Sequence, residues 1–227
     1  MCGRYSLGKT DRVDWGKFGV APLPNLDPHW NIAPGTDVVA IRECAAGREA
    51  TLLRWSLIPS WAKDPSIGNR LANARAETAH EKPAYRSAFK SRRCLLPADG
   101  FYEWQVVKGE KRKQPWRIEA RDGGVLALGA LWESWRDPGG ETHETCTVLT
   151  VPVNKALAHI HDRMPLIVAP CEFGAWLARD TSTERARELC DPAPEALLAA
   201  WPIGLAVNTP TNDDQSVAEP IAQTGRR

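Results

Sequence analysis

A cysteine stands at the second position of the chain, directly after Met1 in the opening "MCGRY". If Met1 is removed, Cys2 carries an amine and a thiol on adjacent carbons, a pair of nucleophiles that no internal residue possesses. Such a terminus can capture an aldehyde first through nitrogen and then through sulfur. The alternative is that Cys2 is one of six cysteines and has no chemical role.

Three other polar residues stand in contexts that suit catalysis, and each has a structural alternative. Glu103, in the aromatic run "DGFYEW", either faces solvent from a strand or occupies a pocket that raises its pKa. His161, in "HIHDRMP", is either a structural histidine or a catalytic one held at the end of an element. Asn73, in "LANARAET", is either the N-cap of a helix or a hydrogen-bonding group of a site.

The cysteine spacing indicates neither a metal centre nor a disulfide framework. The six cysteines are scattered and contain no C-x-x-C pair, so we expect free thiols. His159 and His161 could share a metal ion, but no third ligand lies near them in the sequence. We therefore expect no metal and no other cofactor.

Composition favours a soluble, globular protein. The chain has 227 residues, of which 43% are hydrophobic and 25% charged, enough for one sizeable core. No linker, repeat or low-complexity block divides it, so we expect one domain over residues 1–227 and a monomer.

No apolar run approaches the roughly 20 residues of a membrane span, and the opening residues lack the apolar core of a secretory signal. We expect no membrane association and a cytoplasmic location.

Charge is unevenly distributed along the chain. The formal net charge is only +1, but residues 54–117 hold 14 Lys and Arg against 6 Asp and Glu. The remainder is correspondingly acidic. Such asymmetry allows a basic face that could follow a phosphate backbone, although a solvated charged surface explains the counts equally well.

Strand-like runs outnumber helical ones and do not alternate regularly with them. We therefore expect an α+β fold with a curved, largely antiparallel, barrel-like β core and short peripheral helices. The expected strands are 37–43, 50–57, 93–98, 101–107, 115–120, 125–132, 145–151, 165–169 and 203–208. The expected helices are 152–160, 171–179, 181–190 and 193–201.

The ten tryptophans are many for this length, and core packing is the default explanation for most of them. Trp61 differs because it lies in the proline-bounded loop "PSWAKDP" within the basic segment. A loop tryptophan near arginines could serve as a stacking platform for a nucleic-acid base.

Eight blocks, in order, resemble the SOS response-associated peptidase (SRAP) family. They run from residue 2 to about residue 170, with the weaker "LAVNTP" near 205, and together they make the resemblance specific. Two local departures are Ser56, where glycine is commoner, and Gly35, where a polar residue often follows proline. The blocks are "MCGRY", "HWNIAPG", "RWSLIPSWAKD", "NARAET", "FKSRRCLLPADGFYEW", "GALWE", "TCTVLT" and "IHDRMPLIV".

The resemblance implies a protein that recognises abasic sites in single-stranded DNA and links to them covalently through a thiazolidine. It implies that the peptidase name refers chiefly to self-removal of Met1, and that the protein joins the nucleoid when bound to DNA. By position, Cys2 would be the nucleophile, and Asn73, Glu103 and His161 would complete the active site. Three arginines would line the DNA groove: Arg75 and Arg163 as phosphate contacts, and Arg4 beside them.

Two other kinds of function remain open for this sequence. A conventional thiol peptidase would act on other proteins through a Cys-His-Asn or Cys-His-Glu arrangement. A non-catalytic reader of damaged or modified DNA would need the basic groove but not a free terminus. A stable adduct with an abasic oligonucleotide that requires Cys2 would separate both from the first reading.

Overall fold

The computed structural model describes residues 2–221, and most of its regular structure is β. Five strands close into a barrel in the order β10, β4, β3, β6, β9 and back to β10. The β4–β10 contact is parallel, whereas the other four are antiparallel. The barrel strands are β3 (Asp37–Cys44), β4 (Gly47–Trp55), β6 (Arg93–Ala98), β9 (Leu126–Arg136) and β10 (Thr142–Pro152).

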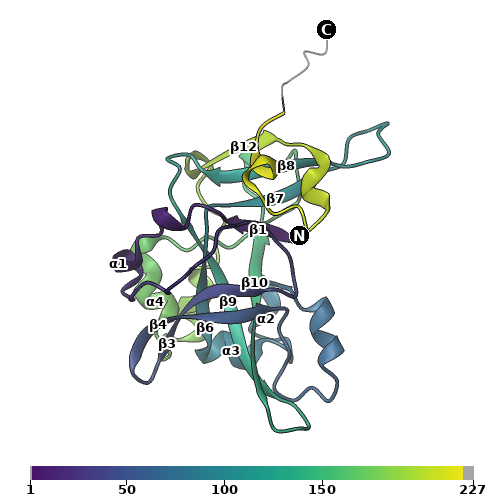
Figure 1. Ribbon diagram of the computed structural model, residues 1–227. Helices are drawn as coiled ribbons and strands as arrows, with labels where there is room; N and C mark the ends of the chain where they lie inside the picture. Colours follow the sequence, from purple (N-terminus) through teal and green to yellow (C-terminus); the bar gives the residue numbers. More distant parts are fainter. Residues whose placement is uncertain (1, 222–227) are drawn as a thin grey trace.

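A second, fully antiparallel sheet lies beside the barrel, above it in Figure 1, in the order β12, β8, β7, β1, β2. Two short strands extend the barrel by pairing with the end of β10: β5 in parallel and β11 in antiparallel. The strands outside the barrel are β1 (Arg4–Leu7), β2 (His29–Ile32), β5 (Asn73–Arg75), β7 (Gly100–Gln105), β8 (Gln114–Ala120), β11 (Arg163–Pro165) and β12 (Leu198–Pro202).

The helices are short and lie around the sheets (Figure 1). The α-helices are α1 (Trp15–Phe18), α2 (Ala76–Ala79), α3 (Arg86–Ser91), α4 (Phe173–Leu177) and α5 (Thr183–Glu188). The 3₁₀ helices are η1 (Thr10–Arg12), η2 (Pro65–Arg70), η3 (Lys155–Leu157), η4 (Pro170–Glu172), η5 (Glu195–Leu197), η6 (Leu205–Asn208) and η7 (Gln215–Ala218). Within the described residues, no helix is both long and apolar enough to cross a membrane.

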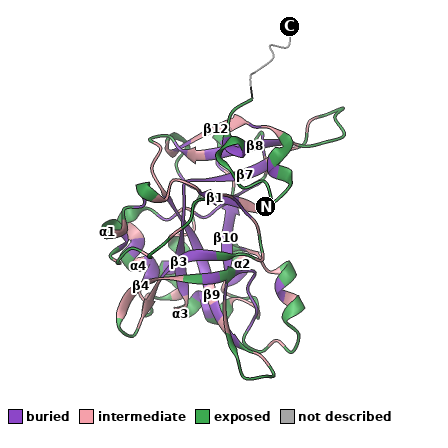
Figure 2. Cartoon of the chain, in the orientation of Figure 1, coloured by how far each residue is buried: buried purple, intermediate pink, exposed green. Residues whose placement is uncertain are grey.

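This architecture confirms the α+β prediction with its curved, barrel-like core. β6, β9 and β10 bury most of their side chains, and Figure 2 shows β9 and β10 largely purple, whereas β4 is mostly half-buried or exposed. β10 carries the run "TCTVLTV", whose β-branched residues pack well on a pleated surface. Ser56, at the end of β4, has φ of 147°, a conformation in which glycine is unstrained. The departure from glycine at this position therefore places a strained residue beside the barrel.

Two predicted elements near the C-terminus are wrong. The segment 193–201 is not a helix: η5 is a single turn, and Leu198–Pro202 pairs with β8 as the edge strand β12. The segment 203–208 is not a strand, because Leu205–Asn208 forms η6 and buries Val207 in a small apolar cluster with Tyr102. In both cases the contact with the second sheet overrides local propensity.

A buried ion pair fixes β1 in the second sheet. Asp99, between β6 and β7, lies 2.9 Å from Nη2 of Arg117 on β8, and both side chains are only 1% exposed. The Asp99 carboxylate also accepts hydrogen bonds from the backbone N–H groups of Gly8 and Lys9 and from the Ser6 hydroxyl. Because these three residues lie in β1 or directly after it, Asp99 holds the N-terminal strand in place.

Gly100 leaves room for this arrangement. A Cβ atom at position 100 would lie 2.8 Å from Cζ of Arg117 and 2.9 Å from the carbonyl oxygen of Ile118. The guanidinium therefore passes directly over the Gly100 backbone. It also donates to Ser6 Oγ at 2.7 Å and to the Tyr102 hydroxyl at 3.0 Å, so both partners of the ion pair are well satisfied.

Removing Asp99 takes the closest carboxylate from the buried Arg117 and leaves it only the longer contact with Glu119, at 3.4 Å. We expect Asp99→Ala to lower the free energy of unfolding by about 3–5 kcal/mol, measured by urea titration. Glu188→Ala removes one side of the exposed Arg185–Glu188 pair and should cost about 0.5 kcal/mol or less. Equal losses in the two variants would contradict the role of the buried pair.

Candidate active site

Cys2 lies just before β1, where the second sheet meets the barrel. Strand β1 pairs with β7 in the register Arg4↔Tyr102, which carries the chain of Cys2 past Glu103. The Cys2 side chain is fully buried, and its Sγ contacts the carbonyl oxygen of Arg4 at 3.8 Å. Burial raises the pKa of the thiol, and the nearby Glu103 carboxylate raises it further. The sulfur is therefore kept as a thiol.

Asn73 reaches Cys2 from the barrel side. It is the first residue of β5, which pairs with β10 through Asn73↔Val148. Its Nδ2 donates a 2.7 Å hydrogen bond to the carbonyl oxygen of Cys2. Its Oδ1 is buried and, among the described residues, has no hydrogen-bond partner. The alternative role as a helix N-cap is wrong, because Arg75 occupies the cap position of α2.

Glu103 reaches the same place from β7 and is only 3% exposed. Burial raises the pKa of its carboxyl group to about 7, and the negative charge of Asp162 acts in the same direction. A carboxyl group with this pKa is present as both acid and base near neutral pH, so it can move protons in either direction. The aromatic surroundings in the sequence therefore correspond to a desolvated pocket rather than to an exposed strand face.

His161 completes the cluster from the turn between η3 and β11. Its Nε2 lies 3.9 Å from Oε2 of Glu103. Its Nδ1 accepts the backbone N–H of Arg163 at 3.0 Å and also lies 2.9 Å from the exposed Asp162 carboxylate. The Arg163 N–H can only donate to Nδ1, whereas the Asp162 carboxylate can only accept; because Asp162 is 82% exposed and can bind solvent instead, we assign the proton to Nε2, facing Glu103. Burial lowers the pKa of the imidazole, which favours this neutral form.

The four predicted catalytic residues are therefore brought together from four segments far apart in the sequence. A small cavity beneath Glu103 and His161, of about 10 Å³, is lined mainly by apolar side chains such as Ile160 and Met164. The arrangement combines a thiol, an amide, and a carboxyl group that titrates near neutral pH beside a neutral imidazole. Such a set of groups can transfer protons around the Cys2 side chain.

The three predicted DNA-binding arginines have different surroundings. Arg75 is exposed at the end of β5. Arg4 donates to Oδ1 of Asn31 at 2.7 Å and to the carbonyl oxygen of Val207 at 2.8 Å, and burial lowers its pKa. Arg163 is largely buried and binds both carboxylate oxygens of Glu77. Only Arg75 therefore presents a fully exposed cation, whereas Arg4 and Arg163 already hold protein acceptors.

Trp61 is 58% exposed and lines a groove of about 420 Å³. Its Nε1 donates to the carbonyl oxygen of Pro83 at 3.3 Å, which fixes one edge of the indole. Asn73, Arg75 and Tyr85 line the same groove, so it leads directly to the residue that holds Cys2. The predicted stacking residue and one predicted phosphate contact thus share one surface.

Two residues with a place in this site escaped the sequence reasoning. Glu77 binds Arg163, and it lies inside the quoted block "NARAET", where its spacing gave no hint of a partner 86 residues away. Asn31 is buried, and besides accepting from Arg4 it donates to the carbonyl oxygens of Val207, Thr209 and Asn212. It thereby ties Arg4 to the C-terminal segment. Both contacts join segments that are far apart in the chain, so the sequence around each residue gives no sign of them.

One group of side chains in the described residues has the spacing of metal ligands: Asp137, Glu141 and His143, at the turn between β9 and β10. The group includes neither His159 nor His161. It lies at the opposite end of β10 from the residues that pair with β5. Asp137 already accepts a hydrogen bond from the Glu141 backbone N–H at 2.8 Å, so hydrogen bonding within the turn explains the position of this carboxylate.

Comparison with known proteins identifies the family. The family model for the SOS response associated peptidase (SRAP) domain matches residues 1–210. The chain belongs to the SRAP family. The abasic site processing protein YoaM of Bacillus subtilis is 36% identical to this SRAP chain over 225 residues, covering 96% of this chain and 98% of YoaM. YedK of Escherichia coli, also named an abasic site processing protein, is 28% identical, covering 97% and 100%.

Two further matches are a longer relative and a solved structure. The abasic site processing protein HMCES of Xenopus tropicalis is 33% identical over 202 residues, which cover 79% of this chain and 60% of HMCES. A crystal structure of a Bacteroides thetaiotaomicron protein has the same fold, with a TM-score of 0.87 at 23% identity and coverage of 97% of this chain and 100% of that one.

The raised pKa of Glu103 makes folding depend on pH. A carboxyl group whose pKa is higher in the folded than in the unfolded protein stabilises the fold fully below pH 4.5 and loses that contribution as pH rises through about 7. We expect Glu103→Gln to be more stable than the wild type at pH 8, by about 3 kcal/mol, and to lose the advantage near pH 4. Urea unfolding across this range measures the difference.

The exposed Glu184→Gln variant serves as the control for this titration. Its stability should follow that of the wild type at every pH, because Glu184 faces solvent. A wild-type and Glu103→Gln pair with parallel stability curves from pH 4 to pH 8 would show that Glu103 titrates normally.

Proposed function

We propose that this protein captures abasic sites in single-stranded DNA by forming a thiazolidine between Cys2 and the aldehyde of the open sugar. The observation that carries the proposal is the meeting of Asn73, Glu103 and His161 around Cys2. The names of the relatives, which are abasic site processing proteins, support the substrate class.

The first chemical step needs a free amine at Cys2, so we propose that Met1 is removed in the reactive protein; Met1 itself lies outside the described residues. The amine adds to the aldehyde, and loss of one water forms an imine. The α-amino group has a pKa near 7.7–8.0 in typical proteins, so a useful fraction is neutral at pH 7. The 2.7 Å bond from Asn73 to the Cys2 carbonyl would hold the reacting terminus in position without adding charge.

Glu103 is the proton-transfer group of this proposal. As an acid, it would protonate the ring oxygen that leaves when the closed sugar opens, and later the hydroxyl lost as water. As a base, it would take the thiol proton when sulfur attacks the imine carbon. The Cys2 thiol then adds across the carbon–nitrogen double bond, and nitrogen gains the proton, so that the second step releases nothing. Because both nucleophiles belong to one residue, ring closure is intramolecular and strongly favoured by proximity.

His161 would hydrogen-bond the sugar oxygen released by ring opening through its Nε2–H. Its neutral form suits this role, because an N–H donor stabilises a developing alkoxide without placing a second charge beside Glu103. We also propose that His161 assists reversal of the link, by returning a proton when the ring opens again. Self-removal of Met1 would use the same groups.

The conventional thiol-peptidase reading receives less support. Cysteine nucleophiles of that class have a lowered pKa, set by a neighbouring imidazolium or a helix N-terminus. Here burial and the Glu103 carboxylate raise the pKa of the Cys2 thiol. Such a sulfur is suited to adding to an imine with local base assistance rather than to attacking a peptide as a free thiolate.

The decisive experiment is intact mass analysis after incubation with an abasic single-stranded oligonucleotide. We expect wild-type protein lacking Met1 to gain the mass of the oligonucleotide minus one water, in an adduct that survives without reductant. Cys2→Ala keeps a terminal amine but has no sulfur to close the ring, so its adduct should appear only when borohydride traps the imine. Cys171→Ala, which removes an exposed thiol, should behave as wild type. A stable adduct in Cys2→Ala would refute the thiazolidine.

The rate of adduct formation should depend on Glu103 and on pH. General acid–base groups typically contribute 10²–10⁴-fold, and we expect Glu103→Gln to slow the reaction by about 10²-fold. In the wild type, the rate should pass through a maximum between the pKa of Glu103, about 7, and that of the terminal amine. In the variant, the rate should instead rise with pH to a plateau as the amine loses its proton. Rapid-quench kinetics measures both profiles, and an unchanged rate in the variant would exclude Glu103 as the acid–base group.

A further inference from the structure

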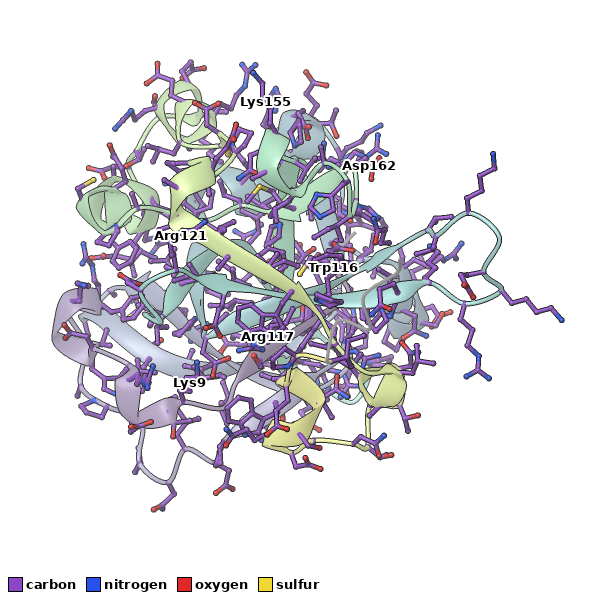
Figure 3. All side chains as sticks on the ribbon, turned by 90° about the horizontal axis from the view of Figure 1, so that it is seen from above. Lys9, Trp116, Arg117, Arg121, Lys155 and Asp162 are labelled. Atoms are coloured by element: carbon purple, nitrogen blue, oxygen red, sulfur yellow. The ribbon has the colours of Figure 1, made fainter. Side chains whose placement is uncertain are left out.

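The hairpin between β7 and β8, residues 106–113, extends away from the body of the protein. The two strands pair as far as Gln105↔Gln114, and the chain then continues beyond the sheet. Figure 1 shows this hairpin projecting at the upper right, and the view from above in Figure 3 shows its long side chains reaching into solvent. We name residues 106–113 the basic hairpin.

Four cations gather on the basic hairpin. Lys108, Lys111, Arg112 and Lys113 are all exposed, against one acidic residue, Glu110. None of the four forms an ion pair with another described residue. In contrast, Arg42 on the barrel is held by two carboxylates. In a chain of net charge +1, this is a local excess of uncompensated positive charge.

The base of the basic hairpin borders the candidate active site. Glu103 lies on β7, two residues before the last residue of that strand. Gln105, at the end of β7, donates to the carbonyl oxygen of His159 at 2.8 Å, which ties the hairpin to the His161 turn. Lys113 is close enough that its positive charge, together with burial, lowers the pKa of His161. A strand leaving the site on this side would therefore meet the hairpin first.

A groove of about 550 Å³ runs along the basic hairpin and is closed on the other side by Leu205 of η6. Leu205 is 41% exposed, and Val107 also lines the groove; its neighbour Val106, outside the lining, is 74% exposed. The same helix η6 supplies the Val207 carbonyl oxygen that holds Arg4. The groove thus combines cations with apolar side chains, and the helix η6 that borders it also contacts Arg4.

We propose that the basic hairpin and its groove bind the single-stranded DNA that flanks the lesion on one side, while the Trp61 groove binds the other flank. This inference rests on the proposed function. The two grooves belong to different parts of the fold: Asn73 on β5 lines one, and the other lies along the hairpin that follows β7, the strand of Glu103. Exposed cations bind a phosphate backbone without sequence preference. Exposed apolar side chains match unpaired bases, whose faces a duplex would hide.

The test measures equilibrium binding, by fluorescence anisotropy, to oligonucleotides with a stable tetrahydrofuran abasic analogue. Single-stranded arms are placed on the 5′ side only, the 3′ side only, or both. The hairpin variant combines Lys108→Ser, Lys111→Ser and Arg112→Ser, and it keeps Lys113 beside His161. The control removes three exposed cations near α1, α4 and α5, on the other side of the molecule in Figure 1: Lys17→Ser, Arg179→Ser and Arg187→Ser.

We expect the hairpin variant to bind about 10- to 100-fold more weakly to one single-armed oligonucleotide and to bind the opposite one normally. Its slope of log affinity against log salt should fall by about 2, as three lost contacts to a single strand predict. The control variant should match wild type in both quantities. Equal weakening for both arms, or no difference from the control, would overturn the proposal. A loss seen only after the arm is annealed into a duplex would also overturn it, in favour of a duplex partner.

The cross-linking assay separates this inference from the proposed function. The hairpin variant retains the active-site residues, so at saturating abasic DNA it should form the adduct at the wild-type maximal rate. If the wild type itself forms no adduct, the proposed function fails, whatever the anisotropy shows. If the wild type forms the adduct and the hairpin variant binds every oligonucleotide as wild type does, only the hairpin proposal fails.

Discussion

The buried contact between Asp99 and Arg117 is the constraint on which the site depends. Strand β1 is only four residues long, and a short strand next to a chain end frays unless other groups hold it. Asp99 accepts from the backbone after β1, and Arg117 binds the Ser6 hydroxyl within it. Removing Asp99 would leave the buried Arg117 with only the longer contact to Glu119, which makes the pair costly to break. Cys2, two residues before β1, is thereby held next to a well-anchored strand.

The same burial that holds the terminus also sets its chemistry. Cys2 and Glu103 lie in a region of low polarity, where the charged forms of both groups are disfavoured. The result is a protonated thiol beside a carboxyl group that titrates near pH 7, with a neutral His161 facing it. Asn73 adds polarity without charge. Arg75 and the four cations of the basic hairpin are exposed, outside this apolar centre. Of these, Lys113 still acts on the site, because its charge contributes to the lowered pKa of His161.

Sequence reasoning succeeded where residue type and context carry the information. The barrel strands were predicted from β-branched and apolar runs, and their placement needed no long-range knowledge. Glu103 was singled out because aromatic neighbours are expected to desolvate it, and its pKa is indeed raised. The reasoning failed at η6 and β12, where contact with the second sheet decides the conformation of short apolar segments. It also missed Glu77 and Asn31, whose partners lie on other strands and leave no periodic signal.

The sequence by itself determined which chemistry is available: a cysteine that can become a terminus, one carboxyl group among aromatics, and enough β-forming residues for a closed core. These follow from side-chain chemistry and local pattern. Only the tertiary structure decided that residues 2, 73, 103 and 161 meet, that Arg163 is engaged by Glu77 while Arg75 is exposed, and that the basic hairpin stands beside the site. Such facts depend on strand pairing between distant segments, and the free energy of that pairing comes from burial across the whole fold rather than from any local stretch.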